Sequence, residues 1–114
     1  MTNSRTKGKT GELEFSHMLK EDGFDAKRGV QYHGGPDSPD VTGLPGIHVE
    51  VKRVEKLNIH DAMDQSRGDS GDDEMPIVAH RKNRKPWLVT MDYKDWIKLY
   101  RCWYGIMEQP DGIQ

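Results

Sequence analysis

Residues 47–54, IHVEVKRV, alternate between apolar and polar side chains, and this pattern constrains the fold more than any other stretch of the chain. Successive side chains of a β-strand point to opposite faces, so His48, Glu50 and Lys52 would share one face. Such a polar face usually meets water, in a half-exposed antiparallel strand. However, only 33% of the 114 residues are hydrophobic and 32% are charged. The core must therefore come from a few concentrated stretches of this kind.

The rest of the chain divides into helices and strands around this segment. A helical pattern opens at Thr10 or Gly11, with Phe15 on its apolar face, and Gly23 supplies its stop. A second helix is expected at 57–68 and ends at Gly68. The strands are predicted at residues 24–32, 40–44, 47–54, 75–81 and 86–91.

A last helix is predicted at 92–104, with Asp92 as its cap. Its aromatic and aliphatic stripe fits either the core or a dimer surface, and comprises Trp96, Ile97, Tyr100, Trp103 and Tyr104. The predicted order of elements is therefore α-β-β-β-α-β-β-α.

Length and composition indicate one domain over residues 1–114, with flexible ends at about 1–6 and 108–114. A single cysteine, Cys102, fits a reducing compartment. No apolar run has the length of a membrane span or of a signal peptide core, so we expect a cytoplasmic protein with no membrane partner. The formal net charge of −2 does not by itself suggest nucleic-acid binding, but the charges are unevenly spread.

Two acidic residues are predicted to meet beside Lys52. Asp40 begins one apolar run, and a turn at Pro45 and Gly46 would fold that run against the next strand, bringing Asp40 near Glu50. Two close carboxylates repel, which raises the pKa of one of them unless a cation lies between them. Mg²⁺ prefers such oxygen ligands. Lys52 would lie on the face of Glu50, where its ammonium could orient or help activate a metal-bound water.

These residues resemble the PD-(D/E)xK nuclease superfamily, with Pro39-Asp40 followed ten residues later by Glu50-Val51-Lys52. A closer similarity is to archaeal-type Holliday-junction resolvases and related small phage-encoded nucleases. The segment KGKTGELEF (residues 7–15) resembles their opening and maps their helix glutamate onto Glu12. A second Pro-Asp pair, at Asp37, is interpreted as loop, because Asp40 alone adjoins the apolar run.

The resemblance implies an α/β, restriction-endonuclease-like fold, with a central mixed sheet flanked by helices. It also implies Mg²⁺-dependent cleavage of DNA, with Mn²⁺ as a substitute. The acids Asp40 and Glu50 would bind the metal with the carbonyl of Val51, Lys52 would orient the attacking water, and Glu12 would support the metal shell. If the protein is phage-encoded, its place would be the host cytoplasm.

Further candidates come from position and charge. Gln65 lies on the helix after Lys52, where related nucleases often carry a polar residue that faces the site. The alternative, an ordinary exposed helix residue, is the commoner case. The phosphate-contact candidates are basic or polar residues, for which solvated surface is the alternative interpretation: Lys7, Lys9, Arg28, His80, Arg81 and Lys82. The five histidines have no HxxxH or HxH spacing, which argues against zinc.

The sequence thus predicts a divalent-metal-dependent endodeoxyribonuclease, similar to a Holliday-junction resolvase, that acts on branched DNA as a homodimer. The alternatives are a nicking or restriction-type nuclease for linear DNA, an RNA-directed nuclease, or a non-catalytic DNA-binding module of recombination.

Overall fold

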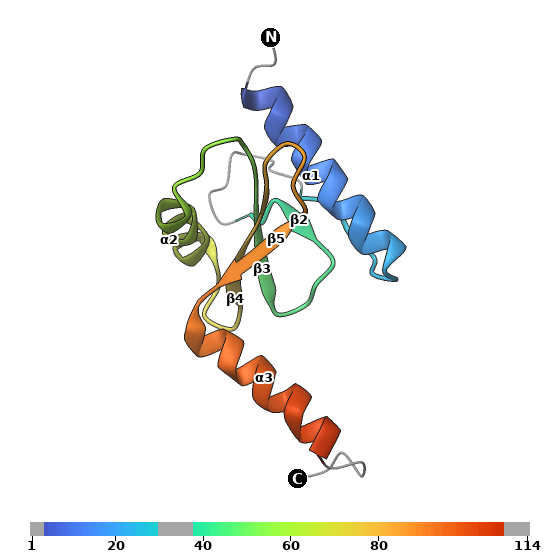
Figure 1. Ribbon diagram of the computed structural model, residues 1–114, viewed down its shortest axis with the longest axis vertical. Coiled ribbons are helices and arrows are strands. Elements are labelled where there is room, and N and C mark those ends of the chain that lie inside the picture. The colour runs from blue at the N-terminus through green and yellow to red at the C-terminus, as the bar shows by residue number, and fades with distance from the viewer. Residues whose placement is uncertain (1–3, 30–37, 109–114) are drawn as a thin grey trace.

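The computed structural model describes residues 4–29 and 38–108, and the side chains of 8–29 and 38–106. It is an α/β structure in which helices flank a five-stranded mixed sheet (Figure 1). Its elements in chain order are α1 (Ser4–Glu21), β1 (Lys27–Arg28), β2 (Val41–Thr42), β3 (Ile47–Arg53), α2 (Ile59–Asp69), β4 (Met75–Arg81), β5 (Leu88–Met91) and α3 (Tyr93–Glu108). The predicted order of elements is confirmed.

Strand β3 lies at the centre of the sheet, whose strands are ordered β1-β2-β3-β4-β5. It pairs antiparallel with β2 and parallel with β4, while the two outer pairs are antiparallel. In the parallel pair, Glu50 lies opposite Val78, and Lys52 lies opposite His80. Because β2 is only two residues long, the second half of β3 extends beyond its β2 partner.

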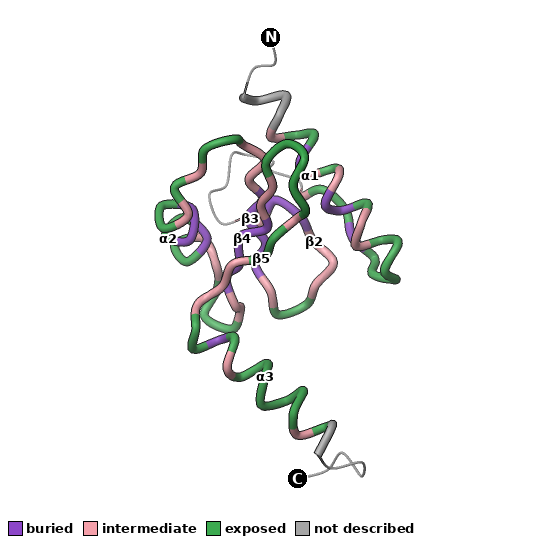
Figure 2. Tube along the Cα trace, viewed as in Figure 1, coloured by how far each residue is buried: buried purple, intermediate pink, exposed green. Residues whose placement is uncertain are grey.

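The two faces of the sheet carry separate apolar clusters, and α1 and α2 lie on opposite sides of it (Figure 1). The larger cluster packs against α1 and comprises Phe15, Ala26, Val41, Val49, Val51, Ile77 and Ala79. On the other face Val78 packs with Ala62 and Met63 of α2. Buried residues concentrate in β3, β4 and the inward sides of these two helices (Figure 2). Strand β3 therefore has both faces covered, and its polar face does not simply meet water.

Several predicted boundaries differ from the structure. Helix α1 begins at Ser4, ahead of the predicted start, because its first turns have no apolar residues and give no periodic signal. Helix α2 continues through Gly68, and Ser70 is its C-cap. Of the strand predicted at 24–32, only Lys27–Arg28 form a strand, while residues 24–26 and 29 are irregular. Residues 30–32, the loop residue Asp37 and parts of the predicted flexible ends lie outside the described residues.

Helix α3 extends away from the sheet (Figure 1), and its aromatic residues are exposed rather than part of the core. Trp96, Tyr100 and Tyr104 stack on one another along the helix. Asp92 precedes the helix as predicted, but its carboxylate accepts hydrogen bonds from Arg67 of α2. Among the described residues, none of the helices combines the length and apolarity that a membrane span requires.

Candidate active site

The carboxylate of Asp40 is held against β3 by backbone hydrogen bonds. Its amide donates to the carbonyl of Val49 at 2.9 Å, and its Oδ2 accepts from the amide of Val51 at 2.8 Å. These bonds place the side chain at the edge of β3 where β2 has not yet begun. Asp40 is 7% exposed and Glu50 is 3% exposed. Both carboxylates are therefore buried beside the same strand.

Glu50 and Asp40 interact strongly. The pKa of Glu50 is raised to about 8: burial is the largest cause, the charge of Asp40 and a hydrogen bond to Asp40 also raise it, and the charge of Lys52 opposes them. The Nζ atom of Lys52 lies 4.0 Å from Oε2 of Glu50, beyond hydrogen-bond distance. The proximity that the Pro45-Gly46 turn predicted for the two acids is thus present, and Lys52 only partly offsets their repulsion.

Glu12 approaches this pair from α1. A Cβ atom at Gly11 would lie 2.7 Å from Cβ of Arg53, so the helix can cross β3 this closely only because position 11 has no side chain. Burial raises the pKa of Glu12, a hydrogen bond from Arg28 opposes this, and the charge of Asp40 adds to it. The Nε atom of Arg28 donates to Oε1 of Glu12 at 2.6 Å. Arg28, a predicted phosphate contact, is therefore engaged with a candidate site residue.

The donor set suits a hard divalent cation. Asp40 and Glu50 supply carboxylate oxygens at one edge of β3. Val51, which lies between Glu50 and Lys52 in sequence, supplies a backbone carbonyl. A buried glutamate with a raised pKa beside a second acid is the electrostatic situation that a bound cation relieves. Oxygen-only ligands of this kind fit Mg²⁺ or Mn²⁺.

Three residues near Glu50 were not among the sequence candidates. His48 is fully buried on the same face of β3, with its Nε2 atom 3.8 Å from Oε1 of Glu50. Its Nδ1 atom lies 3.7 Å from Oε1 of Glu74. Asp69, the last residue of α2, offers a third ligand atom near those of His48 and Glu50. The shared face of His48 and Glu50 was visible in the alternation of β3, but the approach of Asp69 and Glu74 was not.

The predicted residues beyond the acids are dispersed. Gln65 is exposed on α2, one turn before Asp69. Lys9 and Lys82 are exposed, and the side chain of Lys7 lies outside the described residues. His80 shares a 2.8 Å hydrogen bond with Thr90, and burial lowers the pKa of His80. The roles proposed for these residues stay predictions.

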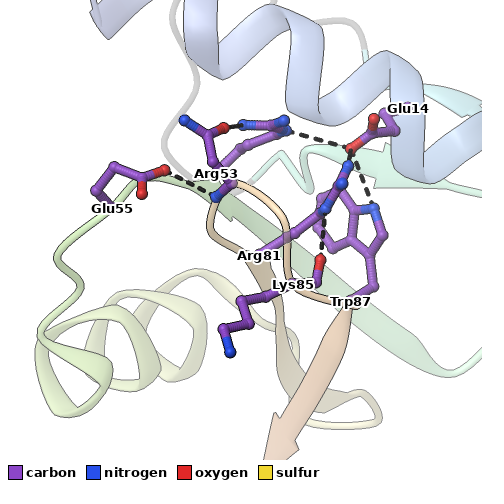
Figure 3. Close-up of polar contacts among 7 residues, drawn as sticks. Glu14, Arg53, Glu55, Arg81, Lys85 and Trp87 are labelled. Atoms are coloured by element: carbon purple, nitrogen blue, oxygen red, sulfur yellow. Dashed lines mark hydrogen bonds and ion pairs between the residues drawn. The ribbon is translucent and has the colours of Figure 1, made fainter.

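Arg81 belongs to a network centred on Glu14, on the α1 face of the sheet (Figure 3). Oε1 of Glu14 accepts hydrogen bonds from Arg81, Arg53 and Trp87 at 2.9, 3.3 and 3.1 Å. The Nε atom of Arg81 also donates to the carbonyl of Lys85 at 2.7 Å. This network fastens α1 to β3, β4 and the segment before β5, and it holds the guanidinium of Arg81.

A groove of about 410 Å³ lies at the same end of β4. Its apolar lining includes Leu57, Ile59 and Leu88. Arg81, Lys82 and Lys85 contribute its basic residues. These basic residues at the end of β4 and in the turn after it therefore border a hollow in the surface.

No family model and no curated protein sequence matches this chain. Among solved structures, the chain is similar to Hjc, a Holliday junction resolvase of the archaeal hyperthermophile Archaeoglobus fulgidus. The identity is 26%, over 75% of this chain and 72% of that chain, with a TM-score of 0.53. Hjc is a PD-(D/E)xK nuclease with a restriction-endonuclease-like fold. The predicted fold class is confirmed.

Proposed function

We propose that this protein is a divalent-metal-dependent endodeoxyribonuclease, similar to a Holliday-junction resolvase and acting on branched DNA. The observation that carries the proposal is the buried Asp40–Glu50 pair, with Lys52 4.0 Å from Glu50, at the edge of β3. The structural similarity to Hjc supports the same reaction class. A structural role alone would not favour two acids in contact within a thin core.

Asp40, Glu50 and the carbonyl of Val51 would hold Mg²⁺, or Mn²⁺ in its place. When bound, the ion would polarise the scissile phosphate and lower the pKa of a water molecule. Lys52, on the face of Glu50, would orient that water through its ammonium group. Glu12 would support the metal shell from α1, and Arg28 fixes its carboxylate. Gln65, exposed on α2, is kept as a candidate site residue.

The DNA would be bound by basic side chains around the site. Lys82 is exposed beside the groove at the end of β4, and Lys9 is exposed on α1, so both can reach phosphates. Lys7, Arg28, His80 and Arg81 complete the set proposed from the sequence. Of these, Arg28 and Arg81 are paired with Glu12 and Glu14, so we expect them to contribute less to phosphate binding than Lys9 and Lys82.

We propose a homodimer for a geometric reason. One set of catalytic residues cuts one strand at a time, whereas resolving a four-way junction requires two symmetric cuts, which a twofold dimer supplies. Trp103 and Tyr104 of α3 are 57% and 48% exposed, and aromatic residues of this kind suit an interface. Trp103→Ala and Tyr104→Ala should weaken dimerisation in light scattering, with exposed Lys98→Ala as a control. A wild-type monomer would contradict the dimer.

One assay tests the function and separates its alternatives. Four-way, flap and linear duplex DNA are incubated with the protein in Mg²⁺, Mn²⁺, Ca²⁺ or EDTA, and the products are separated on gels. We expect cleavage of branched DNA in Mg²⁺ and Mn²⁺, and binding without cleavage in Ca²⁺. Equal cleavage of linear DNA would favour a nicking or restriction-type nuclease. Binding without cleavage in any metal would favour a non-catalytic module, and activity in EDTA would exclude the metal mechanism.

A further inference from the structure

The buried side chain of His48 lacks the hydrogen bonds that its position demands. It is 0% exposed, and neither ring nitrogen has a hydrogen-bond partner among the described residues. Its nearest carboxylate oxygens, on Glu50 and Glu74, are 3.8 and 3.7 Å away, too far for hydrogen bonds. A buried polar group left in this way is costly, so a missing occupant is the simplest physical explanation.

The groups around His48 form a mixed nitrogen and oxygen donor set. One atom each from His48, Glu50 and Asp69 lies within 4.8 Å of the others. The Nε2 to Oε1 separation of 3.8 Å between His48 and Glu50 is close to roughly 3.4 Å, the ligand-to-ligand edge of a tetrahedron with metal–ligand bonds of 2.0–2.1 Å. A small contraction would therefore bring these atoms to coordination distance. The charge of Asp69 also contributes to the raised pKa of Glu50, in line with this proximity.

Glu74 supplies what a metal-bound histidine ordinarily needs on its second nitrogen. Its Oε1 atom faces Nδ1 of His48 and is itself fixed by the amide of Gly71 at 2.7 Å. A carboxylate in this place holds the imidazole in one tautomer and increases its basicity toward a metal on Nε2. The acidic segment after α2 therefore supports His48 rather than forming only solvated surface.

We propose that His48, Glu50 and Asp69 form a second metal site, which binds a divalent transition-metal ion and matches Zn²⁺ best. Three protein ligands of this type leave a fourth position for water. Imidazole favours Zn²⁺ over Mg²⁺, which prefers oxygen ligands throughout. The two oxygens of Glu50 separate this site from the proposed cleavage site, since Oε1 faces His48 and Oε2 faces Lys52. The sites share Glu50, but ion binding here requires no cleavage.

The test is a calorimetric titration of metal-free protein with ZnCl₂. The full chain carries Cys102→Ser, because Cys102 is an exposed thiol that would bind Zn²⁺ by itself. We expect one ion per chain. His48→Gln and Asp69→Asn should weaken binding more than 100-fold, and Glu74→Gln by about 10–100-fold. The exposed histidines provide matched controls, because His17→Gln and His60→Gln should leave the affinity unchanged.

Asp40→Asn separates the two sites. It removes a carboxylate proposed for Mg²⁺, but none proposed for Zn²⁺, so Zn²⁺ binding should persist while cleavage is lost. Zn²⁺ affinity that falls as far in Asp40→Asn as in His48→Gln would overturn the second site. If the wild-type protein shows no nuclease activity in any assay, the proposed function is refuted, but the Zn²⁺ measurement stays valid.

If His48→Gln does not fold, a visible absorption spectrum of protein that retains His48, Glu50 and Asp69 provides the test. Co²⁺ added to the Cys102→Ser protein should give intense visible d–d bands of tetrahedral type, without a thiolate charge-transfer band. Absent Zn²⁺ binding, or a weak octahedral Co²⁺ spectrum, would overturn the proposal.

Discussion

Glu14 and Glu50 lie on opposite sides of strand β3 and have opposite electrostatics. Burial raises the pKa of Glu14, but hydrogen bonds and charges from Arg81 and Arg53 outweigh it, so the pKa is below its usual value. Burial and the charge of the neighbouring Asp40 together raise the pKa of Glu50 to about 8, against the lowering effect of Lys52. The first glutamate is ionised and satisfied, whereas the second is buried without adequate compensation. The sheet therefore combines a stabilising face with a face suited to chemistry.

The apolar clusters follow the same division. The larger one lies between the sheet and α1, where Glu14 joins the helix to two strands (Figure 3). The smaller one, between the sheet and α2, leaves room for His48 and Glu50 on β3. Strained electrostatics of this type concentrate at functional sites because folding stability alone does not favour them. Four predictions test this contrast.

The largest expected effect is on cleavage. Asp40→Asn, Glu50→Gln and Lys52→Ala should each reduce the cleavage rate by about 10²–10⁴-fold or more, because they act on the metal and the attacking water. DNA affinity, measured by gel shift in Ca²⁺, should change little. Glu14→Gln is the control from the other face and should retain activity where the protein is folded. Wild-type turnover in any of the three variants would remove that residue from the mechanism.

The next prediction concerns the pH dependence of stability without metal. The pKa of Glu50 is about 8 in the folded state, above the ordinary value of 4.5, so the folded state binds more protons between these values. The free energy of unfolding should therefore fall as pH rises from about 4.5 to 8. Glu50→Gln removes this titration, so its advantage over wild type should grow across that window, on the order of 5 kcal/mol. Urea unfolding at several pH values measures it, and parallel curves would show that Glu50 titrates normally.

The electrostatic core of the site was predictable because its signals are local. The alternation of β3 places Glu50 and Lys52 on one face, and the Pro45-Gly46 turn returns the chain so that Asp40 lies beside them. The predicted start of α1 was wrong because the first turns of this helix contain no apolar residue. The spacing of apolar residues does not reveal polar first turns that extend a helix beyond the segment packed against the sheet.

The contacts that the sequence did not reveal depend on the tertiary structure. Arg28 and Arg81 were interpreted as phosphate contacts or solvated surface, because their carboxylate partners lie 16 and 67 residues away in sequence, on α1. Asp69 and Glu74 belong to an acidic run that is typical of solvated surface. Their approach to His48 is set by the packing of α2 against the sheet, which no spacing rule describes.

The third prediction addresses the stabilising face. Glu14→Gln should lower the free energy of unfolding by about 1–2 kcal/mol, because Arg53 and Arg81 would lose their shared carboxylate. The modest size reflects the partial exposure of the network. The control is Glu21→Gln, an exposed glutamate on the same helix. A shift of the urea midpoint that is the same for both variants would mean that the network contributes no more than ordinary surface charge.

The smallest effect separates two adjacent basic residues that the sequence could not distinguish. Arg81 donates to Glu14 and to the carbonyl of Lys85, whereas Lys82 is exposed beside the groove. Arg81→Gln should therefore cost about 1 kcal/mol of stability, with little change in the salt dependence of DNA binding. Lys82→Gln should leave stability unchanged and reduce the salt slope by about 0.9, the value of one phosphate contact on duplex DNA. Urea unfolding and binding titrations at several salt concentrations measure both. If Arg81→Gln alters the salt slope as much as Lys82→Gln does, Arg81 both stabilises the fold and contacts DNA. Stabilising and functional charges would then not be separate at this end of β4.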